Sequence, residues 1–189
     1  MAQTTDSGAF SVTRDVVPAH LIDDALRLLH VDLLERGASA EVLGQWLWAA
    51  HWFPHLNYRD EILALETALP AEWREGVLCD PQILLQFPHV GPPPEVTFHL
   101  DREPDWAQGR RYLRIVGIPL SPWRADNGGL LVEGPDGAVP IELDPGDAVM
   151  MQPGLPHSGG INLSGAIRYG VYFRWLEPGP PPPGAPAQS

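Results

Sequence analysis

Apolar residues recur at helical spacing in the first part of the chain. The stripe begins after Pro18 and repeats every three or four residues: Leu21, Ala25, Leu28, Leu29 and Leu33. This periodicity predicts an amphipathic helix, which Pro18 is suited to begin and Gly37 is suited to end. The polar residues 1–14 show no such period, and we expect them to form a frayed start.

Two further helices are predicted by polar residues that precede apolar stretches. Ser39 is suited to cap a helix that runs through about His51, and Asn57 to cap another that stops at Pro70. The N-terminal part is therefore expected to be largely helical over about residues 15–75.

The pattern changes after Pro81, where short apolar runs alternate with clusters of Gly, Pro and Asp. These runs are Ile83–Phe87, Val96–Leu100, Tyr112–Leu120, Leu130–Glu133, Ala148–Met151 and Ile167–Trp175. Many short strands separated by turn signals are typical of a sandwich or barrel. We predict one domain over residues 1–177 with a β core at about 81–176, followed by a disordered, proline-rich tail at 178–189.

One of these runs has an unusual polar face. Within the stretch 95–101, alternate side chains of a strand point the same way, so His99 and Asp101 project side by side. The apolar Val96, Phe98 and Leu100 occupy the opposite face. Such a polar face can simply meet solvent, but an imidazole beside a carboxylate is also a pair of metal ligands.

A second imidazole follows in the turn-rich stretch 153–157. His157 would complete two imidazoles and one carboxylate, the ligand set that holds Fe(II) and leaves positions open for a bidentate 2-oxo acid and oxygen. Arg168, eleven residues later, offers a planar fork suited to the distal carboxylate of 2-oxoglutarate. Gly170, on the same strand face, leaves space for that ligand.

Composition limits the class of protein and its setting. A chain of 189 residues with 44% hydrophobic and 19% charged residues is typical of a globular domain, and its net charge of -12 argues against binding nucleic acid or an acidic membrane. No apolar run approaches membrane-spanning length, and residues 1–11 lack the basic and apolar regions of a signal peptide, so we expect neither a membrane span nor a signal peptide. The single cysteine, Cys79, excludes an intrachain disulfide and suggests a reducing, cytoplasmic setting.

Five segments of the chain resemble the phytanoyl-CoA dioxygenase-like iron(II)/2-oxoglutarate-dependent oxygenases. They are Gln86–Asp101, Asn127–Val132, Pro145–Met151, Pro153–His157 and Asn162–Arg168, within roughly residues 82–175. The resemblance implies a double-stranded β-helix (jelly roll, cupin-like) whose open end holds the metal. It also implies His99, Asp101 and His157 as iron ligands, with Arg168 on the carboxylate of 2-oxoglutarate.

The chain departs from this family at one position near the co-substrate. Gly159 stands where a hydroxyl residue often assists the arginine, which leaves Ser158, Ser164 or Thr97 to take its place. Gln86 is a further candidate for contact with the co-substrate, although a polar residue of the sheet is an equally good interpretation.

Three residues are candidates for contact with the substrate. Trp123 and Asn127 flank a turn expected near the mouth of the barrel, although an Asn-Gly turn also favours Asn127 for its backbone conformation alone. Trp106, with Trp46, Trp48, His51 and Trp52, could line the substrate pocket, although aromatic residues at helical spacing more often form core.

The leading hypothesis is an enzyme, a non-haem Fe(II)- and 2-oxoglutarate-dependent dioxygenase that hydroxylates a small-molecule substrate. The alternative is a cupin-type metal protein, either an isomerase or a ligand-binding module, without 2-oxoglutarate chemistry, because the Pro-Gly-x-x-His core also resembles a cupin motif. A third possibility is a non-enzymatic module in which the site is vestigial.

Overall fold

The computed structural model describes residues 4–6, 8–35, 54–89, 91–93, 95–104, 107, 109–134 and 136–179. The helix predicted from Ser39 to His51, the tryptophans at 46, 48 and 52, the candidate Trp106 and most of the proline-rich tail lie outside these residues. Among the described residues, no helix is long and apolar enough to cross a membrane.

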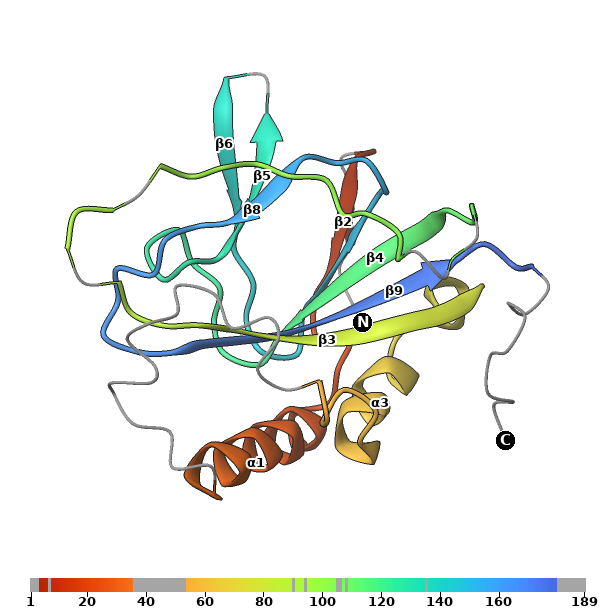
Figure 1. Ribbon diagram of the computed structural model, residues 1–189, viewed down its shortest axis with the longest axis horizontal. Helices are drawn as coiled ribbons and strands as arrows, with labels where there is room; N and C mark the ends of the chain where they lie inside the picture. The colour runs from red at the N-terminus through yellow and green to blue at the C-terminus, as the bar shows by residue number, and fades with distance from the viewer. Residues whose placement is uncertain are drawn as a thin grey trace.

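The described chain is mainly β structure (Figure 1). Its helical elements are α1 (Ala19–Glu35), α3 (Asp60–Thr67) and the short 3-10 helix η1 (Ala71–Trp73). The strands are β1 (Thr4–Asp6), β2 (Phe10–Thr13), β3 (Val77–Gln86), β4 (Tyr112–Pro119), β5 (Leu130–Gly134), β6 (Gly137–Ile141), β7 (Ala148–Met151), β8 (His157–Gly159) and β9 (Arg168–Leu176).

The strands form two antiparallel sheets. The larger has the order β1-β2-β7-β4-β9-β3, and the smaller has the order β6-β5-β8. In Figure 1 the helices lie against the larger sheet, on the side away from β5, β6 and β8. One face of the larger sheet therefore packs on helices, and the other turns toward the smaller sheet.

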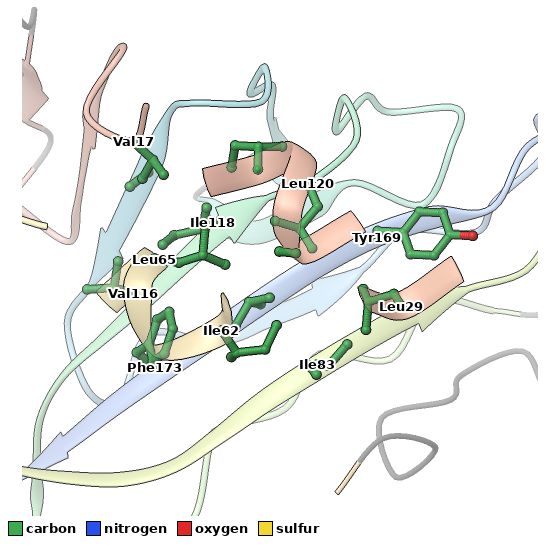
Figure 2. Packing of buried hydrophobic residues seen from close by; sticks show 14 of the residues in the cluster. Val17, Leu29, Ile62, Leu65, Ile83, Val116, Ile118, Leu120, Tyr169 and Phe173 are labelled. Atoms are coloured by element: carbon green, nitrogen blue, oxygen red, sulfur yellow. The ribbon is translucent and has the colours of Figure 1, made fainter. Parts of the chain in front are cut away.

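Strand β9 shows how the sequence divides its residues between these two faces. Val171 and Phe173 point to the helical side, where they pack in a core with Leu29 of α1 and Ile62 and Leu65 of α3 (Figure 2). The alternate residues Arg168, Gly170, Tyr172 and Arg174 point to the smaller sheet, as the period of two predicts. Because Val171 and Phe173 are fully buried, the helical face anchors the strand that carries the two arginines.

The predicted first helix is confirmed as α1, whose buried stripe consists of Ile22, Ala25, Leu29 and Leu33. Leu21 and Leu28 of the predicted stripe are only partly buried. The helix predicted to begin near Asn57 is present as α3, but Asn57 does not cap it. The residue before its first turn is Arg59, which makes no side-chain capping bond, and the negative charges of Asp60 and Glu61 instead lie in the first turn. That placement favours the helix through its dipole.

Two further predictions are wrong. The described residues of the predicted frayed start form strands β1 and β2, and β2 pairs with β7, with Val12 opposite Val149. Alternation of Phe10 and Val12 with Ser11 and Thr13 suits such a strand. The stretch 95–101 is not a strand, since His99 forms only an isolated bridge with His157. Its supposed apolar face is not core, and Leu100 is 50% exposed.

Candidate metal centre

The isolated bridge brings together two segments that are far apart in the chain. The backbone N–H of His99 donates to the carbonyl of His157 at 2.9 Å, and the N–H of His157 donates back at 3.0 Å. The two imidazole rings consequently lie 4.6 Å apart between centroids. In Figure 1 the chain between β3 and β4 crosses beside β8, which places this pair at the edge of the smaller sheet.

Asp101 completes a cluster of three donors. Its Oδ1 atom lies 3.8 Å from Nε2 of His99 and 3.8 Å from Nε2 of His157. One donor atom from each of the three residues lies within 4.8 Å of the others. The residues that the sequence singles out as metal ligands are thus brought together at one point.

Hydrogen bonds orient the donors for a cation. Nδ1 of His157 lies 2.9 Å from the carbonyl oxygen of Leu155. A carbonyl only accepts, so Nδ1 carries the hydrogen and the lone pair of the neutral ring is at Nε2, on the side of Asp101. His157 is also buried, whereas the side chain of His99 is 57% exposed.

The protonation states also suit a metal. Burial and the neighbouring His157 lower the pKa of His99, against a smaller effect of Asp101. Burial alone would raise the pKa of Asp101, but the charge and hydrogen bond of Arg174, together with the imidazoles, outweigh it, so this pKa lies below its ordinary value. Neutral imidazole and ionised carboxylate are the forms that bind metal ions. Two nitrogens and one oxygen fit Fe(II) with open positions.

Arg168 is buried on the face of β9 that turns toward the smaller sheet, and it is not part of the wall of the cavity that holds the three metal-ligand candidates. Its Nε donates to Oε1 of Gln86 at 3.0 Å, and its Cζ lies 5.1 Å from the centroid of the Trp123 ring. Nη1 and Nη2 are buried, and neither has a hydrogen-bond partner among the described residues. Burial lowers the pKa of Arg168, because the charge is removed from water, against a smaller opposing effect of the neighbouring Tyr172 hydroxyl. Two orphaned donors on a buried cation fit a carboxylate ligand.

Gln86 and Ser164 were predicted to contact the co-substrate, and both lie in defined hydrogen-bond networks. Gln86 holds Arg168 and donates through Nε2 to the carbonyl of Gly160. The hydroxyl of Ser164 lies 2.7 Å from Oδ1 of Asn162 and 3.2 Å from the carbonyl of Ala166, within its own turn. Gln86 thus orients the arginine, and Ser164 stabilises a loop.

Trp123 and Asn127, the two predicted substrate-contact residues that the structure describes, lie elsewhere than expected. Trp123 is completely buried and stacks on Tyr172, with 5.6 Å between ring centroids, so it serves as a wall of the core beneath Arg168. Asn127 is used by its own turn: Oδ1 accepts the N–H of Arg124, and Nδ2 donates to the carbonyl of Pro122. Neither residue lines the cavity at the metal centre.

That cavity has a volume of about 540 Å³ and contains all three metal-ligand candidates in its wall. The other lining residues are Pro54, Asn57, Pro81, Gln82, Leu84, Arg102, Tyr112, Leu130, Gly159, Tyr172 and Arg174. Sequence reasoning did not select Tyr172 and Arg174 as site residues. The sequence could have indicated them, because they lie on the same face of β9 as Arg168.

No protein-family model and no curated protein matches this chain. Solved structures do match. AviO1 from Streptomyces viridochromogenes Tue57 is 22% identical with a TM-score of 0.56, over 94% of this chain and 93% of AviO1. EvdO2 from Micromonospora carbonacea var. aurantiaca, complexed with 2-oxoglutarate, is 18% identical with a TM-score of 0.58, over 97% of each chain.

A third structure is the non-haem α-ketoglutarate-dependent epimerase SnoN from nogalamycin biosynthesis. It is 15% identical with a TM-score of 0.59, over 89% of this chain and 76% of SnoN. Two further matched structures are longer than this chain, which covers 49% of one and 48% of the other. These likenesses confirm the predicted fold class: the chain has the double-stranded β-helix fold that these structures share, with helices in its N-terminal part.

Proposed function

We propose that this protein is a non-haem Fe(II)- and 2-oxoglutarate-dependent oxygenase that hydroxylates a small molecule. The observation that carries the proposal is the convergence of His99, Asp101 and His157 within 4.8 Å at the wall of a cavity. The two orphaned donors of the buried Arg168 support a second, anionic ligand in the same fold.

Each residue has a distinct role in this proposal. His99, Asp101 and His157 hold Fe(II), and Arg168 binds the distal carboxylate of 2-oxoglutarate. When both are bound, the centre supplies oxidative decarboxylation of 2-oxoglutarate coupled to oxidation of a substrate C–H bond. Gln86 and the Trp123 ring keep the guanidinium in place, and the cavity of about 540 Å³ is of a size suited to a small-molecule substrate.

Two further proposals concern the whole chain. We propose that residues 1–177 form one domain, supported by β2, near the start, and β9, near the end, sharing a sheet. We also propose a cytoplasmic setting, supported by the single cysteine of the chain.

The test is an anaerobic titration of the full-length protein with Fe(II) and then with 2-oxoglutarate, followed by visible absorption. A weak charge-transfer band is expected for the wild type and not for His99→Ala. Succinate formation stimulated by a member of a metabolite library would then identify the substrate class. If the wild type binds the metal tightly but shows no band and no 2-oxoglutarate binding, the cupin-type alternative replaces this proposal.

A further inference from the structure

Arg174 lies in the cavity wall but has no part in holding the metal or 2-oxoglutarate in the proposal above. It follows Arg168 on the same face of β9, and its side chain is only 13% exposed. Its Nε donates to Oδ2 of Asp101 at 2.8 Å, and its Nη2 donates to Oε1 of Gln82 at 2.8 Å. Its Cζ lies 5.9 Å from the centroid of the Tyr172 ring. The contacts with Gln82 and Tyr172 therefore fix the guanidinium in the orientation in which it donates to Oδ2 of Asp101.

The two carboxylate oxygens of Asp101 thus face different partners. Oδ2 is bonded to Arg174, whereas Oδ1 is the atom 3.8 Å from both imidazole nitrogens. A carboxylate without such a partner can rotate and bind a cation with both oxygens. We propose that Arg174 is a positioning residue that restricts Asp101 to offering one oxygen, Oδ1, to the metal. A single bond from Asp101 preserves a position for the bidentate 2-oxo acid. This inference rests on the metal site of the proposed function.

A simpler role for Arg174 leads to the opposite expectation. As a cation close to the site it competes with the metal for Asp101, and if that were its whole effect, its removal would tighten metal binding. If positioning dominates, its removal weakens metal binding, by roughly 10- to 100-fold as is typical for residues that orient a ligand. Lysine distinguishes the two roles further, because it keeps the charge but loses the planar fork.

The experiment is an anaerobic titration of the metal-free, full-length protein with Co(II), followed by the visible d–d absorption. The variants are Arg174→Met, Arg174→Lys and Gln82→Met, with Arg27→Met on the exposed face of α1 as the matched control. Both Arg174 variants are expected to bind Co(II) at least about 10-fold more weakly and to change the shape of the spectrum. Gln82→Met, which loosens Arg174 without touching Asp101, is expected to give a smaller change of the same kind.

Tighter Co(II) binding by Arg174→Met, or wild-type affinity and spectrum in both Arg174 variants, would overturn the inference. If Arg174→Met does not fold by circular dichroism, Arg174→Lys and Gln82→Met decide the question in the same way. Failure of the proposed function looks different. A wild type that binds Co(II) without any response to 2-oxoglutarate overturns that proposal, while the variants still decide the role of Arg174. A wild type that binds no Co(II) overturns both.

Discussion

Replacing Arg168 with methionine should weaken 2-oxoglutarate binding strongly while changing the stability of the ligand-free protein little. The side chain is fully buried; its Nε donates to Oε1 of Gln86, and the hydroxyl of Tyr172 lies beside the guanidinium. Each charge-assisted hydrogen bond to a carboxylate contributes about 1.5–3 kcal/mol. Two such bonds from Nη1 and Nη2 amount to about 3–6 kcal/mol, so Arg168→Met should weaken 2-oxoglutarate binding by about 100- to 20,000-fold.

The stability of the ligand-free protein should change much less. Burying a cation without a counter-ion carries a desolvation cost of several kcal/mol, which an apolar methionine of similar length would remove. The substitution also leaves Oε1 of Gln86 without its donor, which costs about 1–3 kcal/mol. These two effects oppose each other, so we expect the free energy of unfolding without ligand to stay within about 2 kcal/mol of the wild type.

Thermal unfolding with and without 2-oxoglutarate, under anaerobic conditions with Mn(II) present, measures both quantities. A ligand at 100 times its Kd stabilises by about 2.7 kcal/mol, which corresponds to a rise in Tm of about 5–10 °C for a domain of this size. The wild type and the control Arg27→Met should show this rise, and Arg168→Met should not. A full rise in Arg168→Met would refute the assignment of Arg168 to the carboxylate.

Three other substitutions test the core, the arginine pocket and the metal. Phe173→Ala should lower the free energy of unfolding by about 3–5 kcal/mol in urea denaturation, because Phe173 is fully buried in the helical core; a loss below about 1 kcal/mol would contradict that packing. Gly170→Ala would place its Cβ 2.5 Å from Cζ2 of Trp123, so it should lower the free energy of unfolding by about 1–3 kcal/mol. It should also weaken 2-oxoglutarate binding in the same thermal assay. Unchanged binding would show that the position of Trp123 does not affect the co-substrate site. His157→Ala should retain less than about a tenth of the wild-type Fe(II) after gel filtration, measured by elemental analysis; equal iron in both proteins would remove His157 from the ligand set.

Within a single strand or helix, the local sequence was sufficient to predict which residues share a face. The alternation along β9 places Arg168, Gly170, Tyr172 and Arg174 on one face, because side chains of any strand alternate with a period of two. The stripe of α1 follows in the same way from the period of the helix. The residue types at positions 99, 101 and 157 also indicate a metal by their chemistry alone, since imidazole and carboxylate are its ligands.

Contacts between distant segments were decided only by the tertiary structure. Asp101 is 73 residues from Arg174, and Gln86 is 82 residues from Arg168, so no local period relates the members of either pair. The sequence alone also left Trp123 as a candidate for the cavity wall, whereas packing over Gly117 and Gly170 buries it completely. The physical reason is that the pairing and register of strands determine which side chains meet, and these depend on the whole sheet rather than on any one segment.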